Sequence, residues 1–334
     1  MRWAFTDRTE KLDTFILGDL NIIRYRTNNE LDGVDQDYNG GLHYSISELW
    51  DASAEARYTM DSQIDRDIET TGLLLGTTER EHQHYAAGTG YRLTEATSTS
   101  IKYAYDRDDF SKSDFVDSVS QEAGLGFTYD LSSISMLTYA RINIGYNSYY
   151  YTEVDVNSFS GLAGIGAQFS ETLGASIDAG YQYTRSAFQA GAFTPDKDIQ
   201  TIQGPIGKAS LNYRGEMSDA SLSVYHFVKP LSGIPGTAMR TSVRLDAHQK
   251  ITYKFHASLM MEYFLNKADQ GQQASEDIDQ ETWRAQLGLS YDITNDLSCE
   301  GAYRYTRLND HIDGQDSPQN LVYLRVVWQY PIPH

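Results

Sequence analysis

The sequence has no long apolar run. No stretch of its 334 residues approaches the roughly 18 consecutive apolar residues that a membrane-spanning helix requires. Proline is scarce, with 7 residues, and the mean hydropathy is -0.50. These absences exclude helical membrane spans. They are compatible with strands that cross a membrane, because only every second residue of such a strand meets lipid.

Cysteine is nearly absent too. The single cysteine, Cys299, cannot form an internal disulfide, so the count is compatible with an oxidising compartment without demonstrating one. A secretory signal peptide is also missing, because residues 1–5 lead directly into the charged residues 7–11. An outer-membrane protein needs such a signal, so we expect the chain to be a mature or shortened form.

Enzyme motifs are missing as well. The sequence has no Gly-rich phosphate loop, no Gly-x-Ser-x-Gly elbow and no paired cysteines with zinc spacing. His82 and His84 share one face of a predicted strand, and His256 and Ser258 share another near Asp246. A polar lining explains both groups better than a metal site or a hydrolase. We therefore expect no enzyme, no catalytic residue, no cofactor and no bound metal.

The chain does contain a repeated sequence pattern. A strand ends in an aromatic residue, a tight polar turn follows, and the next strand carries aromatic or apolar residues at alternate positions. This pattern recurs about every 40 residues, with one gap of about twice that length. Its leading aromatics are Tyr91, Tyr129, Phe169, Tyr213, Tyr291 and Tyr330. Each period holds two amphipathic strands, one short turn and one long polar loop, which is typical of a transmembrane β-barrel.

Alternation of apolar and polar residues predicts about sixteen strands, within a range of about 14 to 18. An even number would place both termini on the same side. The predicted strands are 14–26, 38–47, 52–60, 85–93, 99–106, 123–131, 140–147, 163–169, 175–184, 208–213, 220–227, 239–247, 253–263, 283–293, 297–306 and 322–330.

The two faces of these strands differ in kind. Trp283, Leu287 and Ile293 alternate with polar residues such as Arg284 and Gln286. We expect the apolar set to meet lipid, with aromatic girdles at both boundaries, and the polar set to line the lumen. The expected lumen-lining residues are Arg57, Lys102, Glu122, Arg141, Asp178, Lys208, Arg244, Asp246, Lys254, Glu262, Arg284, Glu300, Arg304 and Arg325.

The net charge of -19 does not arise from this lumen set, which has nine basic and five acidic residues. The acid excess lies in the long loops, as in Asp32, Asp35 and Asp37. Solvation explains it, although divalent cations bridging the loops to anionic lipopolysaccharide remain an alternative. We expect outer-membrane lipid and lipopolysaccharide as partners, and no nucleic acid, because the exposed charge has the wrong sign.

The last predicted strand resembles the C-terminal assembly signal of bacterial outer-membrane proteins, since residues 324–330 alternate and end on Tyr330. The whole chain resembles outer-membrane β-barrels of about sixteen strands. Its Tyr-x-Tyr segments at 103–105, 181–183 and 303–305 are similar to those of barrels associated with exopolysaccharide export. That resemblance implies an integral protein of a Gram-negative outer membrane, and a passage for a secreted polysaccharide or another polar solute, with a periplasmic export partner.

Two alternatives share this fold class, an all-β antiparallel transmembrane barrel with short periplasmic turns and long extracellular loops. A general diffusion porin would fold one long loop inward, and the candidate loops are residues 62–76 and 187–203. A scaffold would sheathe a partner protein such as a cytochrome or a lipoprotein. We expect one domain over residues 1–334, in which residues 1–12 could instead form a flexible or periplasmic segment.

Overall fold

The computed structural model describes residues 2–24, 32–61, 72–73, 78–133, 137–189, 198–231, 233–270, 273–275, 277–294 and 296–328. These residues form 17 strands in one sheet. The strands are β1 (Arg2–Arg8), β2 (Leu12–Ile23), β3 (Gly33–Ser45), β4 (Trp50–Asp61), β5 (Arg80–Arg92), β6 (Thr97–Phe110), β7 (Ser118–Asp130), β8 (Thr138–Tyr151), β9 (Val154–Gln168), β10 (Leu173–Phe188), β11 (Asp198–Arg214), β12 (Ser218–Pro230), β13 (Thr237–Lys250), β14 (Phe255–Ala268), β15 (Ile278–Asp292), β16 (Leu297–Asp310) and β17 (Gln315–Trp328). No helix among the described residues is long and apolar enough to cross a membrane.

Each strand pairs antiparallel with the next strand along the chain, from β1–β2 to β16–β17. The predicted all-β antiparallel class is therefore confirmed. Register follows the alternation of the sequence, because a slip of one residue would exchange the two faces. Between β14 and β15, for example, Leu259 lies opposite Leu287 and Glu262 lies opposite Arg284.

Burial on the two faces is the reverse of that in a soluble protein. The apolar face is exposed, with Leu287 at 53% and Ile177 at 57% of full exposure. The face with the charged residues is the covered one, where Arg284 is only 5% exposed. An apolar outer face of this extent is stable only against lipid or another apolar partner.

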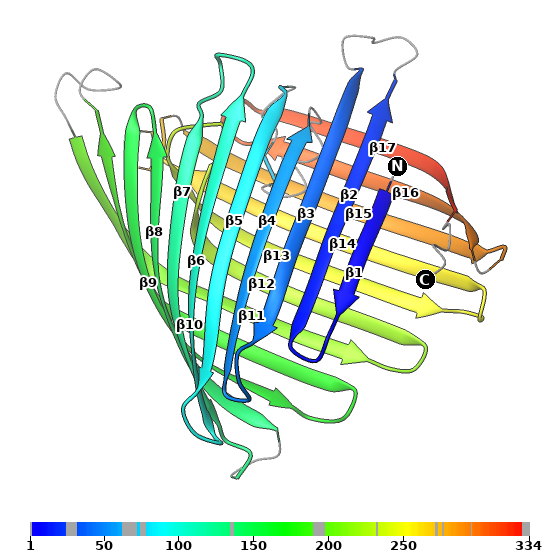
Figure 1. Ribbon diagram of the computed structural model, residues 1–334. Coiled ribbons are helices and arrows are strands. Elements are labelled where there is room, and N and C mark those ends of the chain that lie inside the picture. Colours follow the sequence, from blue (N-terminus) through cyan, green and yellow to red (C-terminus); the bar gives the residue numbers. More distant parts are fainter. Residues whose placement is uncertain are drawn as a thin grey trace.

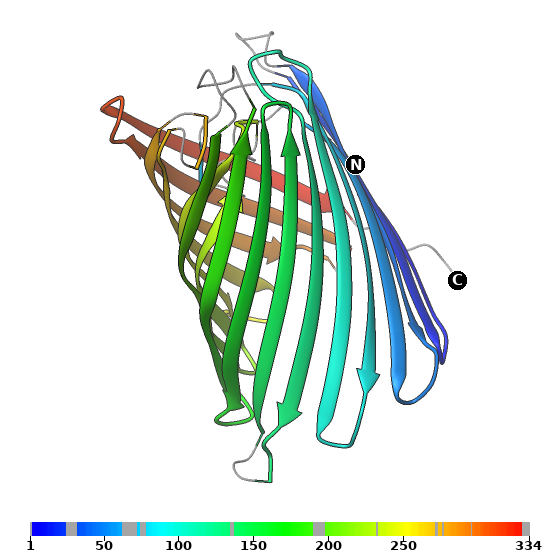
Figure 2. The same ribbon diagram turned by 90° about the vertical axis from the view of Figure 1, so that its left-hand side faces the viewer.

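The sheet curls so that β2–β8 form one wall and β11–β17 form the facing wall, with β9 and β10 at the bend (Figures 1 and 2). Close approach of backbones at the bend explains the glycines there. A Cβ on Gly180 of β10 would collide with the Gly161 carbonyl oxygen of β9. Gly180 therefore serves sheet curvature at this position.

The 17 strands of the described residues fall within the predicted range of about 14 to 18. All sixteen predicted strands exist, but Arg2–Arg8 forms an additional strand, β1, instead of a flexible or periplasmic segment. With 17 strands, the chain enters at the long-loop end and leaves β17 at the short-turn end. The two ends of the sheet therefore do not lie on the same side, as an even number would have required.

Most strands also extend further at the long-loop end than predicted. These extensions carry charged pairs, as where Arg307 of β16 donates to Asp316 of β17 at 3.0 and 2.7 Å. That hydrogen bond lowers the pKa of Asp316. Both side chains are about half exposed, so the extension stands in water beyond the aromatic residues that end the apolar face.

The first and last strands have one neighbour each. Among the described residues, β1 pairs with β2 alone and β17 with β16 alone, and the two edge strands lie on opposite walls (Figure 2). The outer residues of β17 are accordingly more exposed than those of inner strands, with Leu324 at 83%. The sheet is thus a barrel wall with two unpaired edges.

Candidate functional site

The predicted lumen residues lie where the alternation placed them, with one exception. All of them except Lys254 are on strands, on the face opposite the exposed apolar residues. Lys254 lies in the turn between β13 and β14, because β14 begins at Phe255. Its Nζ atom is 3.5 Å from the Ile293 carbonyl oxygen at the next turn, so its predicted place on a strand was wrong.

Several of these residues form ion pairs between strands. Arg141 of β8 reaches across β9 to Asp178 of β10, to which Nε donates at 2.5 Å. Glu262 of β14 joins two arginines: Arg244 Nη1 donates to it at 2.7 Å, and Arg284 forms an ion pair with it. Glu262 and Asp178 are almost fully buried. Pairing and hydrogen bonding offset the cost of burying these charges.

Towards β17 the pairs continue. Arg304 Nε donates to the Gln286 side chain at 2.8 Å, and Arg325 Nη2 donates to Glu300 at 2.5 Å. Arg57 binds Asp37, a residue outside the predicted set. In the part of the chain that the structure describes, Lys102, Lys208 and Glu122 have no ion pair, and these side chains remain available to a solute.

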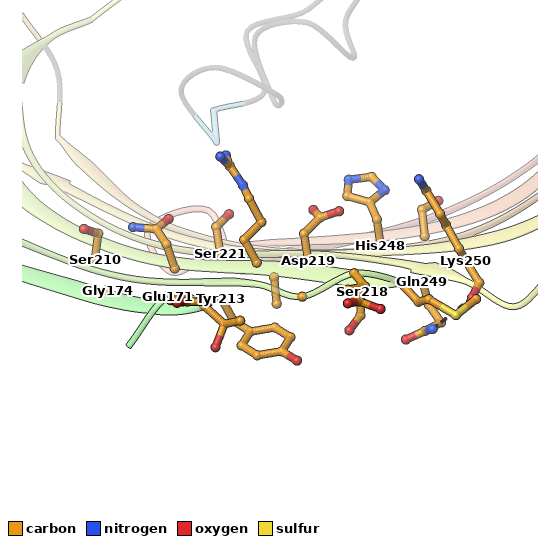
Figure 3. Close-up of a pocket in the computed structure, with 18 of the residues that line it drawn as sticks. Glu171, Gly174, Ser210, Tyr213, Ser218, Asp219, Ser221, His248, Gln249 and Lys250 are labelled. Atoms are coloured by element: carbon orange, nitrogen blue, oxygen red, sulfur yellow. Dashed lines mark hydrogen bonds between the residues drawn. The ribbon is translucent and has the colours of Figure 1, made fainter. Parts of the chain in front are cut away.

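A vestibule of about 1,060 Å³ opens at the short-turn end, lined by residues from β8 to β16. Figure 3 shows Ser210, Asp219 and His248 pointing to the inner side, while Tyr213 and Gln249 lie on the other side of the strands. The lining is polar and carries both charge signs. His256 belongs to it and lies 3.1 Å from Asp292, not beside Asp246. The vestibule offers many exchangeable hydrogen bonds to a polar solute.

An apolar cluster lies at the long-loop end. Leu73, from the segment between β4 and β5, is buried together with Leu231, Ala238, Ala268, Ala274 and Ile278. The carbonyl oxygen of Gly72 accepts a hydrogen bond of 2.6 Å from Thr282 Oγ1 of β15. Gly72 has a φ of +72° and packs against Phe264, where a Cβ would collide. One of the two loops predicted to fold inward, 62–76, therefore reaches the facing wall at its described residues.

The tip of the β12–β13 hairpin also turns inward. Pairing between β11 and β12 stops at Gly207 and His226, although both strands continue. Val228 of β12 instead meets the Gln182 side chain of β10: its N–H donates to Gln182 Oε1 at 3.1 Å and its carbonyl accepts from Nε2 at 3.3 Å. An amide side chain thus replaces the missing strand partner.

Tyr151 of β8 holds the same hairpin from the other side. Its hydroxyl lies 3.1 Å from the Leu231 carbonyl oxygen and 3.0 Å from that of Gly236. Its ring belongs to a second buried cluster with Tyr149, Val154, Val156 and Phe188. We use the term cap for the following group: the two buried clusters, Gly72, Thr282 and the tip of the β12–β13 hairpin (residues 227–239). The other loop expected to fold inward, 187–203, contributes Phe188 to the cap at the end of β10, and its residues 190–197 lie outside the described part.

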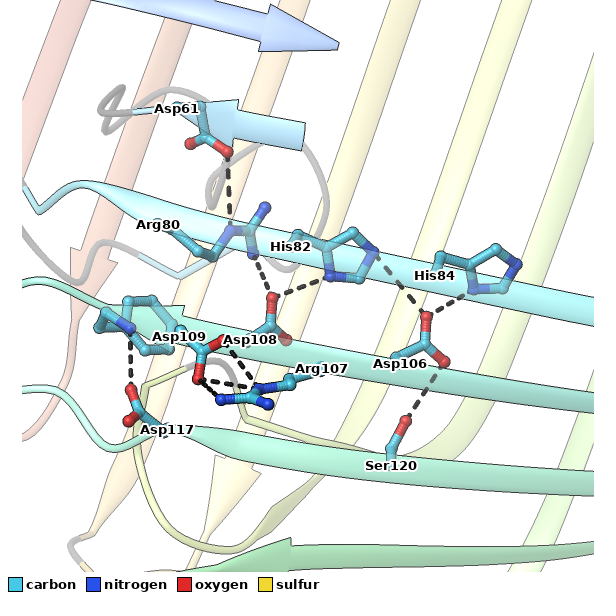
Figure 4. A network of polar contacts seen from close by, with 11 residues as sticks. Asp61, Arg80, His82, His84, Asp106, Arg107, Asp108, Asp109, Asp117 and Ser120 are labelled. Atoms are coloured by element: carbon cyan, nitrogen blue, oxygen red, sulfur yellow. Dashed lines mark hydrogen bonds and ion pairs between the residues drawn. The ribbon is translucent and has the colours of Figure 1, made fainter. Parts of the chain in front are cut away.

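A polar network occupies the inner face of β5 and β6 beside the cap (Figure 4). His84 Nδ1 lies 2.6 Å from Asp106, and His82 Nδ1 lies 2.9 Å from Asp108. Arg80 joins Asp61 to Asp108. No group of three or more His, Cys, Asp or Glu side chains in the described residues is placed to hold a metal ion. The histidines are thus paired with carboxylates.

Sequence reasoning did not find the contacts that make the cap. Thr282 and Gly72 are 210 residues apart, and nothing local marks them as partners. One signal was available in the neighbouring strand: Pro205 lies within β11, between Gly204 and Gly207. Proline cannot donate to a ladder and is confined to strand edges, so it marks the part of β11 that has one neighbour.

No family model matches the sequence, and no curated protein does. Solved structures do match. The copper transporter OprC is 9% identical over 93% of this chain and 59% of its own, with a TM-score of 0.56. The ferric citrate transporter FecA in its unliganded form is 8% identical over 92% and 56%, with a TM-score of 0.54. The FrpB iron transporter of Neisseria meningitidis, as the F5-1 apoprotein, is 8% identical over 92% and 58%, with a TM-score of 0.53.

The chain thus spans less than two thirds of the length of these proteins. At such identities the similarity concerns the fold alone. Together with the exposed apolar face and the charged inner face, it places the chain in the class of outer-membrane-type β-barrels. None of the three names refers to polysaccharide export, so the predicted resemblance to exopolysaccharide barrels receives no support.

Proposed function

We propose that this chain forms the wall of an outer-membrane transport barrel for small polar solutes, gated at its long-loop end by the cap. The observation that carries the proposal is the Gly72–Thr282 contact, by which Gly72, between β4 and β5, reaches the facing wall. The polar vestibule at the other end supports it. The apolar outer face would meet lipid, and the acidic loops would meet lipopolysaccharide.

The cap favours a small solute over a secreted polysaccharide. A polymer in transit needs a continuous opening at both ends, whereas buried apolar side chains such as Leu73 and Phe188 lie at the long-loop end. A scaffold role would need the same space for a partner protein. An infolded loop is the feature expected of a diffusion porin, and conductance separates a permanently open pore from a gated one.

The test is conductance in planar bilayers with wild type and Leu73→Asp. Leu73 is 1% exposed, so a carboxylate there would draw its segment out of the apolar cluster into water. We expect wild type to be closed most of the time and Leu73→Asp to raise the open probability several-fold. Leu93→Asp, in an exposed short turn, is the matched control and should behave as wild type.

Electrophoretic mobility with and without heating shows whether each variant is folded. A folded Leu73→Asp protein that inserts into the bilayer but shows no conductance, like wild type, would contradict transport and favour the scaffold. A wild type that is permanently open, with no change in the variant, would favour the porin without a gate.

A further inference from the structure

A separate cavity of about 620 Å³ lies beneath the cap. One side is the inner face of β4 to β8, and the other is the β12–β13 hairpin, which has turned inward to face it. The volume falls within the range typical of small-molecule sites. It is thus large enough for a solute of several heavy atoms, and it differs from the vestibule at the short-turn end.

The hairpin side of this cavity is cationic. Lys229 and Arg240 line it. Arg240 Nε donates to Asn266 at 2.7 Å, but its Nη2 atom is buried with no hydrogen-bond partner in the described part of the chain. Lys229 has neither a hydrogen bond nor an ion pair among the described residues, and its nearest ring is Phe227, at 5.9 Å. An unpartnered buried guanidinium nitrogen calls for an acceptor.

The opposite side carries both charge signs, because Arg57 and Arg80 line it together with carboxylates. Arg57 is bound to Asp37, and Arg80 joins Asp61 to Asp108. Asp106 and Asp108 line it but are already paired with the histidines of β5. Glu122 of β7 lines it too, and within the described residues it has no hydrogen bond or ion pair. Of the carboxylates near Lys229, Glu122 has the largest electrostatic effect on it. A free anion and a free cation therefore face each other without closing into a pair.

Aromatic rings lie between the two charged sides. Tyr149 and Tyr151 of β8 both line the cavity and are almost fully buried. Because the Tyr151 hydroxyl is engaged by the hairpin backbone, its ring is held in place. Such rings give an apolar surface for a short carbon chain, with charge of opposite sign at either end.

We propose that this cavity binds a small zwitterion, with the carboxylate of the ligand at Lys229 and Arg240 and its ammonium group at Glu122. A purely anionic ligand would leave Glu122 unpaired beside it, and a purely cationic one would leave the two basic groups unpaired. A zwitterion satisfies both sides at once. The inference deepens the proposed function by giving a solute class, but binding itself does not require conduction.

Equilibrium dialysis of the folded full chain in detergent tests it, with labelled 6-aminohexanoate as the probe. Hexanoate and hexylamine are the single-charge comparisons. We expect 6-aminohexanoate to bind about tenfold or more tightly than either, because each additional charge-assisted contact has that order of effect. Similar affinity for all three, or no binding of any, would overturn the proposal whatever the conductance experiment shows.

Variants locate the site. Glu122→Gln should abolish the preference over hexanoate, and Lys229→Gln should abolish the preference over hexylamine. The double exchange Glu122→Lys with Lys229→Glu should restore binding of 6-aminohexanoate, because the ligand can reverse its direction. Lys208→Gln, an inner-face lysine outside the cavity lining, is the matched control. Unchanged binding in both single variants, or equal loss in the control, would overturn the assignment to this cavity.

Discussion

At the scale of single residues, the reversal of burial between the two faces is the strongest physical evidence for the environment of the wall. Ile144 of β8 is 56% exposed and carries no polar atom, while its neighbour Asn143 points to the inner face. In water an exposed sheet of this kind would aggregate. In lipid the same residues are favourably placed.

This contrast gives a prediction for adjacent positions. Ile144→Arg should destabilise the folded protein in lipid by about 2–4 kcal/mol, the cost of a cationic side chain at mid-bilayer depth on a barrel exterior. Asn143→Arg should cost far less because it faces the polar interior. Urea unfolding in lipid vesicles measures both. Equal losses would show that the two faces do not differ in environment, and a larger loss for Asn143→Arg would show that they are exchanged.

At the scale of elements, strand existence was predictable from the sequence, but strand ends were not. The alternation in β15 from Trp283 onward identifies the strand, yet β15 begins at Ile278, whose side chain packs into the apolar cluster of the cap. β1 was missed because its seven residues begin and end with arginine. Lys254 was misplaced because alternation alone does not show where a turn ends.

Contacts between separate elements could not be predicted, for a different reason. Alternation placed Arg284 and Glu262 on one face, but only the register of β14 and β15 shows that they are opposite each other. Gln182 bonds to a strand that is not its neighbour, and no local pattern encodes that contact. Of the predicted residues, Tyr330 lies outside the described part of the chain.

The Gln182 contact leads to a prediction for the hairpin. Gln182→Ala would leave the Val228 N–H and carbonyl groups without partners, at a cost of about 1–3 kcal/mol for each unsatisfied buried group. We expect faster hydrogen exchange at residues 227–239 and little change elsewhere. Gln286→Ala is the control, since Gln286 bonds only to side chains. Unaltered exchange of the hairpin in Gln182→Ala would show that another contact holds it inward.

At the scale of the whole molecule, the two edges determine how the wall can exist in a membrane. Unpaired backbone groups are not tolerated in hydrocarbon, which is why membrane sheets close into barrels. β1 and β17 both run from the long-loop end to the short-turn end, so direct closure would form a parallel pair. Closure by further strands would need an odd number of them to remain antiparallel throughout.

Hydrogen exchange at single-residue resolution shows whether the edge strands β1 and β17 are unpaired or covered by another segment. In detergent, every second amide of β17 should exchange quickly, because β16 binds only the amides that face it, whereas the amides of β10, paired on both sides, should be slow. After transfer to lipid nanodiscs we expect the fast amides of β17 and of β1 to become slow together, since lipid offers them no water. The mass of the particle then shows whether one chain closes on itself or a second polypeptide covers both edges. Amides of β17 that stay fast in lipid would show that this edge is not within the membrane.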